Sequence, residues 1–376
     1  MTQPLEDITV IELAGLGPIP FAGMVLAGMG AEVILVDRPD GPPIPDVMVA
    51  AVGRGKRSVA IDLKHPLGPS TLLRLVAGAD ALIEGFRPGV VERLGVGPDE
   101  CFSSNPDLIY GRMTGWGRSG PYAMMAGHDI NYIGLTGALD AIGDARGPLP
   151  PLNLIGDYGG GAMYLVAGLL AALLDREGSG GRVVEAAMVD GAASLMSPFY
   201  EMLGGGAWQN QRASNLLDGG APFYTTYATS DNRHVAVGAL EPQFYSALLE
   251  GLGLDEADLP DRLDRARWPE LRDRLAEVFA GSTMTEWEVV FDGTDGCVTP
   301  VLDMGEAPLH PVNRERGVFT DDGRYPLPAP APRFDVDLPA ELAPAPGPGQ
   351  HTDEVLSDAG FDESEISALR AEGAVG

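Results

Sequence analysis

The first 38 residues alternate between strand-like and helix-like patterns, and this alternation constrains the fold more than any other feature of the chain. A β-branched run, ITVIEL (8–13), is followed by PFAGMVLAG (20–28), which has helical spacing, and by a second strand-like run, AEVILVDR (31–38). Two parallel strands need a crossover connection, which is usually a helix. The start of the chain therefore predicts a βαβ unit and a parallel sheet.

The same alternation continues to about residue 188. Further strands are expected at 57–63, 80–86, 106–115 and 182–188, and helices at 69–78 and 159–177. An ordered series of strands and helices is typical of α/β domains, in which helices cover the sheet. We therefore expect an α/β domain with a wound parallel sheet in the first half of the chain.

The second half of the chain differs in composition and in its pattern of predicted elements. A Gly-, Asn- and Gln-rich stretch (204–222) reads as a linker, and 223–240 reads as two strands around the turn residues SDN. Helices are expected at 242–252, 268–280 and 284–293, Pro-rich extended segments within 324–348, and an amphipathic segment at 362–373. The predicted division is a large domain (1–200), a linker (201–222), a small α+β domain (223–310) and a return segment (311–376) whose C-terminal helix packs on the large domain.

Composition excludes several function classes. The formal net charge of −29 repels nucleic acid and anionic membranes. The two cysteines, Cys101 and Cys297, form no metal-binding pattern and are expected to be reduced thiols. The first residues, MTQPLEDITV, have neither the basic region nor the apolar region of a signal peptide, so none is expected. The longest apolar run (162–174) is expected to be too short to span a bilayer. We expect a cytoplasmic protein without a membrane partner.

The turn after the first strand does not fit a dinucleotide site. Gly15 and Gly17 match the first two glycines of the G-x-G-x-x-G pattern, but the third position is Pro20. Pro18 and Pro20 also remove backbone donors from the turn that would hold a pyrophosphate. The stretch is better read as a tight turn with proline in the first turn of a helix.

Cations are concentrated near the ends of the second and third predicted strands. These cations are Arg38, Arg54, Lys56, Arg57 and Lys64, with Arg87 as a weaker member, and they include both lysines of the chain. A solvated surface turn explains such a cluster in most proteins. In so acidic a chain, cations at the carboxyl ends of parallel strands favour a phosphate-bearing ligand.

Three acid–base residues stand in distinctive contexts, although each has a structural alternative. His128 in AGHDINY taken alone is a satisfied structural histidine. Asp157 in LIGDYGGGAMYL is either an N-cap or a buried base beside a glycine turn that lets a ligand approach. Glu241 in GALEPQFY complements the dipole of a following helix. These residues alone do not distinguish a catalytic role from a structural one.

Long sequence motifs favour the catalytic roles of these residues over the structural ones. The stretches VIELAGLGPIPFAGMVLAGMGAEVILVDRP, GRGKRSVAIDLK, GFRPGVVERLGVGP, MAGHDINY, LIGDYGGGAMYLV, LDGGAPFYTTY, VAVGALEPQFY, FDGTDGCVTPVL and GQHTDEVL resemble the α-methylacyl-CoA racemases of the family III CoA-transferase superfamily. They extend from residue 8 to about 356, nearly the whole chain. The Pro-rich stretch near 324–348 has no matching motif.

The resemblance implies a fold and a set of site residues. It implies a Rossmann-like large domain, a small domain and an interlocked homodimer. His128 and Asp157 match the family's two bases, and Glu241 matches the acid that orients the histidine. The CoA contacts map onto Arg38, Ile61, Asp62, Leu63, Lys64, Gly127, Asp129, Ile130, Asn131 and Tyr132.

The implied reaction is inversion at C2 of a 2-methylacyl-CoA thioester through an enolate. A proton must leave one face and return to the other, which requires two groups that exchange the roles of acid and base. The resemblance implies that His128 takes the proton from the (S)-epimer and Asp157 from the (R)-epimer. No metal or cofactor is expected, because CoA is part of the substrate.

Two other functions remain open. A family III CoA-transferase would use Asp157 as a nucleophile and pass through an aspartyl-CoA thioester. A non-catalytic acyl-CoA carrier would keep the cations but would have no use for the three acid–base residues. The methionines of 113–127 either offer a soft surface to the acyl chain or belong to the core.

Overall fold

A computed structural model describes residues 3–39, 50–176, 180–321, 325–335 and 342–376, which form two compact units. Unit 1 comprises Met1–Thr136, Leu152–Leu195 and Gly317–Gly376, and unit 2 comprises Gly137–Pro151 and Met196–Arg316. This division differs from the ranges expected from the sequence, because a short excursion at 137–151 leaves unit 1 and the chain returns to it at 317.

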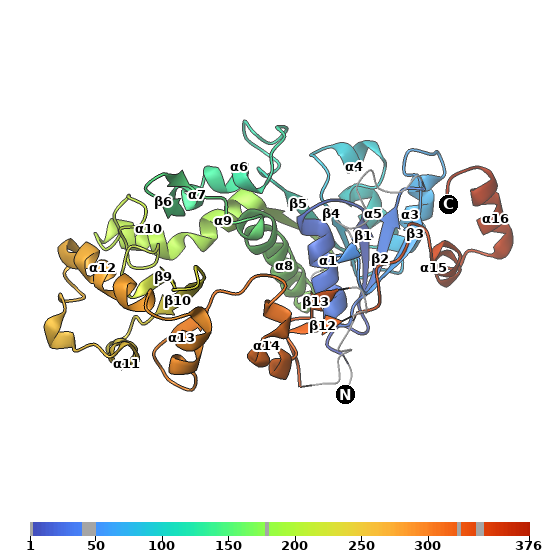
Figure 1. The fold of residues 1–376 in the computed structure, drawn as a ribbon. Helices are drawn as coiled ribbons and strands as arrows, with labels where there is room; N and C mark the ends of the chain where they lie inside the picture. Colours follow the sequence, from blue (N-terminus) through green and yellow to red (C-terminus); the bar gives the residue numbers. More distant parts are fainter. Residues whose placement is uncertain (1–2, 40–49, 177–179, 322–324, 336–341) are drawn as a thin grey trace. The chain divides into compact units, whose positions relative to one another are not determined.

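Unit 1 is built on a parallel sheet of six strands in the order β3-β2-β1-β4-β5-β8 (Figure 1). The strands are β1 (Thr9–Leu13), β2 (Glu32–Asp37), β3 (Lys56–Ala60), β4 (Ala81–Glu84), β5 (Ile109–Thr114) and β8 (Arg182–Ala187). All five strand pairs are parallel. The expected α/β class with a parallel sheet is therefore confirmed.

Helices cover both faces of this sheet. They are α1 (Pro18–Gly28), α3 (Gly68–Val76), α4 (Val90–Arg93), α5 (Pro98–Ser104), α6 (Asp129–Gly134), α8 (Met163–Leu174), α9 (Met188–Leu195), α15 (Thr352–Asp358) and α16 (Glu363–Ala371). Successive residues of a strand point to opposite faces. Val10 accordingly joins the core under α1 and α8, while Ile11 joins the core that contains residues of α3, α5, α15 and α16.

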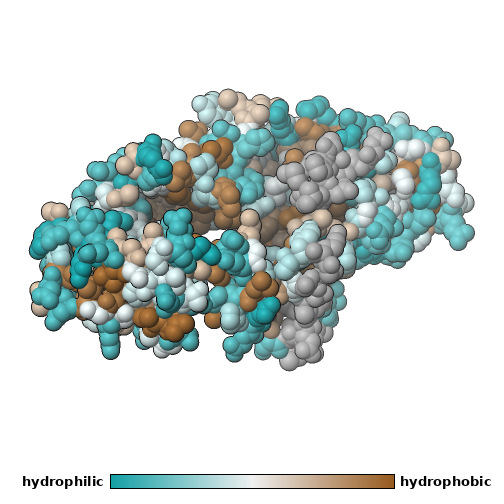
Figure 2. Space-filling model, in the orientation of Figure 1, coloured by the Kyte–Doolittle hydropathy of each residue, from teal (hydrophilic) through white to brown (hydrophobic). Residues whose placement is uncertain are grey.

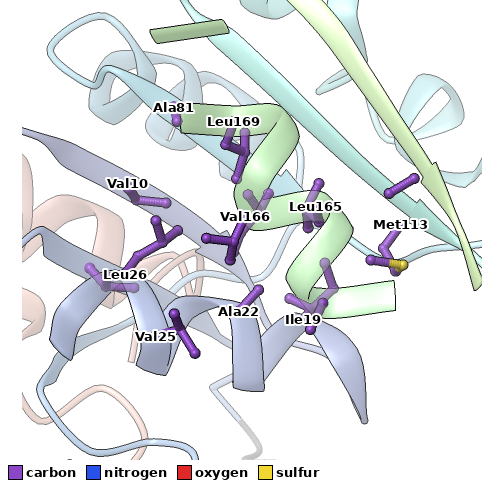
Figure 3. Packing of buried hydrophobic residues seen from close by; sticks show 14 of the residues in the cluster. Val10, Ile19, Ala22, Val25, Leu26, Ala81, Met113, Leu165, Val166 and Leu169 are labelled. Carbon is purple, nitrogen blue, oxygen red and sulfur yellow. The ribbon is translucent and has the colours of Figure 1, made fainter. Parts of the chain in front are cut away.

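The core under α1 and α8 is tightly packed. Ile19, Ala22 and Leu26 of α1 meet Leu165 and Leu169 of α8 above the sheet (Figure 3). All five side chains are buried, with 1% exposure or less. This packing fixes the start of α8, and with it the segment that precedes α8.

The helix predicted at 159–177 begins earlier than its sequence indicates. A π-helix, η1 (Leu154–Ala162), runs directly into α8, so the helical segment Leu154–Leu174 is 21 residues long. Among the described residues, this is the one helix that is long and apolar enough to cross a membrane. A helix in the core of a globular protein can be equally long and apolar. We predicted that the apolar run (162–174) is too short to span a bilayer. The helix that contains this run is longer, because the glycines at 159–161 continue it, so the predicted length was wrong.

The return segment covers the outer edge of β3. His351 N–H donates to Ser58 O (2.9 Å), Thr352 Oγ1 accepts from Ala60 N–H (3.1 Å), and Gly376 N–H donates to Ala60 O (3.1 Å). Before it, β12 (Phe319–Asp321) and β13 (Pro326–Pro328) form a small antiparallel pair. Part of the predicted Pro-rich stretch, 336–341, lies outside the described residues.

Unit 2 contains an antiparallel sheet, β11-β10-β9, with its own core. Its elements are α7 (Ala138–Ala141), β6 (Gly143–Asp144), β7 (Gly147–Pro148), α10 (Ser197–Gly204), β9 (Tyr224–Ala228), β10 (His234–Gly238), α11 (Pro242–Leu252), η2 (Glu256–Asp258), η3 (Arg265–Arg267), α12 (Trp268–Phe279), α13 (Met284–Phe291), β11 (Val298–Pro300), η4 (Ala307–Leu309) and α14 (Pro311–Arg316). The hairpin and the three helices predicted for this region are present.

The stretch 204–222 is a folded loop, and its prediction as a linker was wrong. Asn215 is fully buried at its centre. Its Nδ2 donates to Gln209 O (2.9 Å) and Asp218 Oδ2 (2.8 Å), while Asp218 Oδ1 accepts from the amide of Asn215 (2.8 Å). Asn and Asp side chains that bind nearby backbone groups are the reason these polar residues build a turn here.

Candidate active site

The two predicted bases lie on neighbouring elements of unit 1. His128 directly precedes α6, and Asp157 lies within η1. Asn131 Oδ1 accepts from the amide of His128 (3.0 Å), and Asn131 N–H donates to His128 O (2.8 Å). These reciprocal bonds fix the backbone of His128 at the helix start, while the side chain is exposed. Sequence reasoning had assigned Asn131 only a CoA contact.

A buried carboxylate connects these two elements. Asp129 is 5% exposed, and its Oδ2 accepts hydrogen bonds from the amides of Gly156 (2.6 Å) and Asp157 (2.7 Å). The residue after one predicted base therefore holds the backbone of the other. Asp129 was predicted as a CoA contact, and its side chain instead faces the protein interior.

The glycine run beside Asp157 serves helix packing. A Cβ on Gly160 would lie 2.5 Å from Ala192 N, and one on Gly161 would lie 2.9 Å from Met188 Cγ. Both partners belong to α9. The expected flexible turn for ligand approach is therefore not what these glycines form, and Asp157 is not an N-cap, because it is the fourth residue of η1.

The carboxylate of Asp157 is half-buried against the turn that follows β1. Asn153 Nδ2 donates to Asp157 Oδ2 (3.1 Å), and a Cβ on Gly17 would lie 2.9 Å from the same oxygen. Gly17 has φ +66°, a conformation that favours glycine. The absence of a side chain at Gly17 in the GLGP turn therefore leaves room for the Asp157 carboxylate. Neither contact was predicted: Gly17 and Asp157 are far apart in sequence, and the Asn153 contact, four positions away, comes from a π-helical turn that the sequence did not indicate.

The electrostatics of Asp157 suit an acid–base role. Burial raises the pKa of Asp157, and the charge of Asp129 raises it further, whereas the hydrogen bond from Asn153 and the charge of His128 lower it. A carboxyl with a raised pKa holds a proton at higher pH than an ordinary aspartate. The influence of His128 also shows that the two predicted bases are close enough to interact electrostatically.

Aromatic side chains support the loop before His128. The Tyr132 hydroxyl donates to Gly127 O, and the Tyr132 ring packs edge-on against Trp116, with the ring centres 4.7 Å apart. Tyr132 is buried, and a Cβ on Gly115 would lie 2.2 Å from its ring. Burial raises the pKa of Tyr132, and the charge of Asp157 adds to this effect. The hydroxyl is therefore a neutral donor that holds the loop in place.

The remaining predicted CoA contacts lie at the carboxyl ends of adjacent strands. Arg38 follows β2, and the segment Ile61–Lys64 follows β3. Arg38 and Lys64 are exposed, Asp62 Oδ1 accepts from the Lys64 amide (2.9 Å), and Ile61 is buried in a bridge to Val375. In open parallel sheets ligands bind outside the carboxyl ends of the strands. Ile130 is exposed on α6.

Three members of the predicted basic cluster are already paired within the protein. Lys56 is fully buried, and its Nζ donates to both oxygens of Glu12 (2.7 and 2.9 Å) and to Pro20 O (2.9 Å). Arg54 binds Ala51 O and Pro328 O, and Arg57 bridges Glu32 and Asp358. The ligand reading of these three cations was wrong, because carboxylates distant in sequence neutralise Lys56 and Arg57, and backbone carbonyls hold Arg54.

Removing one partner of the buried Glu12–Lys56 pair should strongly destabilise the protein. Lys56→Met is expected to lower the free energy of unfolding by about 3–5 kcal/mol, because it leaves Glu12 buried without a counter-charge. Urea denaturation measures the change. Lys64→Met is the matched control, since the Lys64 ammonium is exposed, and it should change stability by less than about 0.5 kcal/mol. Equal midpoints for the two variants would contradict the prediction.

The third predicted acid–base residue belongs to unit 2. Glu241 directly precedes α11, is exposed, and accepts the Tyr245 amide through its backbone carbonyl (2.9 Å). Its orientation of His128 stays a prediction. Within the described ranges, no group of three His, Cys, Asp or Glu side chains is arranged to hold a metal ion.

Comparison with known proteins agrees with this arrangement. Residues 5–352 match the model of CoA-transferase family III. The alpha-methylacyl-CoA racemases of Mus musculus and Homo sapiens are 47% and 46% identical to this chain, each over 98% of the chain and 96% of the relative. The crystal structure of a CAIB/BAIF family protein from Brucella suis matches with a TM-score of 0.80 at 26% identity, over 96% of this chain and all of that one. The chain belongs to CoA-transferase family III.

Proposed function

We propose that the protein is a 2-methylacyl-CoA racemase that inverts C2 of its substrate by two-base proton transfer. The observation that carries the proposal is the link between the elements of the two bases: Asp129, the residue after His128, accepts short hydrogen bonds from the amides of Gly156 and Asp157. Two acid–base groups on separate elements are what proton exchange at opposite faces of one carbon requires. The identity to two racemases supports the same reaction.

The thioester supplies the acidity that the reaction needs. CoA would extend from the exposed cations Arg38 and Lys64, at the carboxyl ends of β2 and β3, toward His128 and Asp157. One base removes the C2 proton, and the electron pair of the C–H bond moves into an enolate. The other group then gives its proton to C2 from the opposite face. One proton leaves and one arrives, and exchange with water restores the starting enzyme.

Backbone donors are available for the enolate oxygen. The amide of His128 binds Asn131 Oδ1, and the amides of Asn131 and Tyr132 bind His128 O. Among the described residues, the amides of Asp129 and Ile130 are the first-turn donors left without a partner. Donors aimed at developing negative charge stabilise a transition state strongly. We assign the enolate oxygen to these amides.

The remaining features belong to the same proposal. Glu241 orients the imidazole of His128, no cofactor takes part because CoA is part of the substrate, and the protein works in the cytoplasm as a homodimer. Figure 2 shows apolar groups open to solvent among hydrophilic ones on the face that it displays.

One incubation separates this function from its alternatives. A single epimer of a 2-methylacyl-CoA is kept with the protein in D2O, and both α-deuteration and the epimer ratio are followed. Deuteration with approach to an even epimer mixture is the expected result. Transfer of CoA to an added carboxylate without α-exchange would establish the CoA-transferase instead. Binding of acyl-CoA with neither reaction would leave only a carrier.

A further inference from the structure

The side chain of Asp129 has no role in the two-base scheme as described so far. One of its oxygens, Oδ2, accepts from two consecutive amides of η1, those of Gly156 and Asp157. The space for this contact exists because residue 156 is a glycine. A Cβ there would lie 2.7 Å from Asp129 Oδ2 and 3.2 Å from Asp129 Cα. The contact between α6 and η1 therefore depends on this carboxylate and this glycine together.

The second oxygen gives Asp129 an electrostatic role. Oδ1 is buried and has no hydrogen-bond partner in the described part of the chain. A buried charge that is incompletely compensated acts strongly on its neighbours, because little water screens it. The negative charge of Asp129 acts on Asp157 and favours the protonated form of the Asp157 carboxyl.

We propose that Asp129 is a positioning residue of the racemisation, whose buried carboxylate fixes the Asp157 backbone relative to His128. The inference rests on the proposed function. When His128 removes the C2 proton, Asp157 must already hold the proton that it will donate. An ordinary aspartate is ionised at neutral pH, so the scheme needs a neighbour that favours the acid form.

The other ionisable groups around Asp129 do not duplicate this effect. Its own segment carries His128 and Tyr132, η1 carries Asp157 and Tyr158, and α9 carries Asp190, which is exposed. Arg87 adds a positive charge near Tyr132. Among these groups, Asp190 is the one other anion besides Asp157, and because its side chain is exposed, water and salt screen its charge.

Three variants test the inference. Asp129→Ala removes the acceptor and the charge, and it should lower kcat by about 100-fold with little change in KM, because small misplacements of a reacting group have effects of this size. Asp129→Asn keeps an acceptor oxygen for the two amides and removes only the charge. Asp80→Asn is the matched control: Asp80 also accepts a backbone amide, that of Thr9 (2.8 Å), but it precedes β4, at the amino edge of the sheet.

The pH profile of kcat/KM for the (R)-epimer gives the readout that a purely structural role would not move. In this direction Asp157 must be ionised, so its pKa governs the acidic limb. Asp129→Asn removes a charge that raises the pKa of Asp157, and the acidic limb should therefore move to lower pH. In Asp80→Asn the limb should stay where it is in the wild type.

The outcomes are distinguishable. If the wild type neither deuterates nor epimerises its substrate, the proposed function fails and the inference fails with it. If the wild type is active but the Asp129→Asn profile superimposes on that of Asp80→Asn, the inference is overturned and the proposed function stands. If circular dichroism shows that Asp129→Ala does not fold, the Asp129→Asn profile alone decides.

Discussion

Replacing His128 by alanine is expected to reduce epimerisation of both epimers by about 10²–10⁴-fold, the usual contribution of a positioned general acid–base group. The loss should appear in kcat, since in the proposed mechanism the ring exchanges the reacting proton. The fold should persist, because the side chain of His128 is exposed and Asn131 binds its backbone. Chiral analysis of the product combined with deuterium incorporation in D2O measures both effects.

A second histidine provides the control for this variant. His234 lies on β10 of unit 2, with an exposed side chain. His234→Ala should keep wild-type kcat and KM. Full activity in His128→Ala would rule out the two-base scheme, whereas equal losses in both variants would point to a general effect of histidine removal.

Replacing Asp157 by alanine should separate proton exchange from inversion. Epimerisation of both epimers should fall by at least about 100-fold, because one face of C2 has lost its acid–base group. Deuteration of the (S)-epimer should continue, since His128 still removes and returns a proton on its own face. The measurement is mass gain of the substrate in D2O with the epimer ratio unchanged.

The controls for Asp157→Ala address stability and covalent chemistry. The carboxylate is held by Asn153 and borders Gly17, so urea denaturation should confirm that the variant is folded. Loss of (S)-deuteration to the same degree as epimerisation would contradict separate roles for the two bases. A mass increase on Asp157 in the wild type, formed on incubation with the acyl-CoA and discharged by an added carboxylate, would identify the residue as the nucleophile of a transferase.

The parallel sheet was predictable because its signal is local. Runs such as 31–38 are apolar and β-branched, since both faces of a central parallel strand are buried. Each of the six predicted strands overlaps an observed one, and their order in the sheet comes from the structure. The π-helix was not predicted, because its stability comes from close packing of glycines against α9 rather than from propensity.

In the site, too, features that are local in sequence were predicted, and contacts between residues far apart in sequence were not. His128 and Asp157 were identified by residue type and motif, but the bonds that join their elements link residues 27 and 28 positions apart. Lys56 was misread for the same reason, because its partner Glu12 is 44 positions away on another strand. Sequence patterns describe which groups are present, and they do not describe which groups neutralise one another.

The way the return segment covers β3 has a consequence for synthesis of the protein. Ser58 and His351, which bind each other, are 293 positions apart. While the chain emerges from the ribosome, β3 is an unprotected sheet edge until nearly the whole sequence has been made, and such edges pair readily with other chains. Contacts this distant also slow folding. Newly made chains should therefore depend on chaperones and aggregate when overproduced quickly, and unit 1 should be completed only after translation of its final segment.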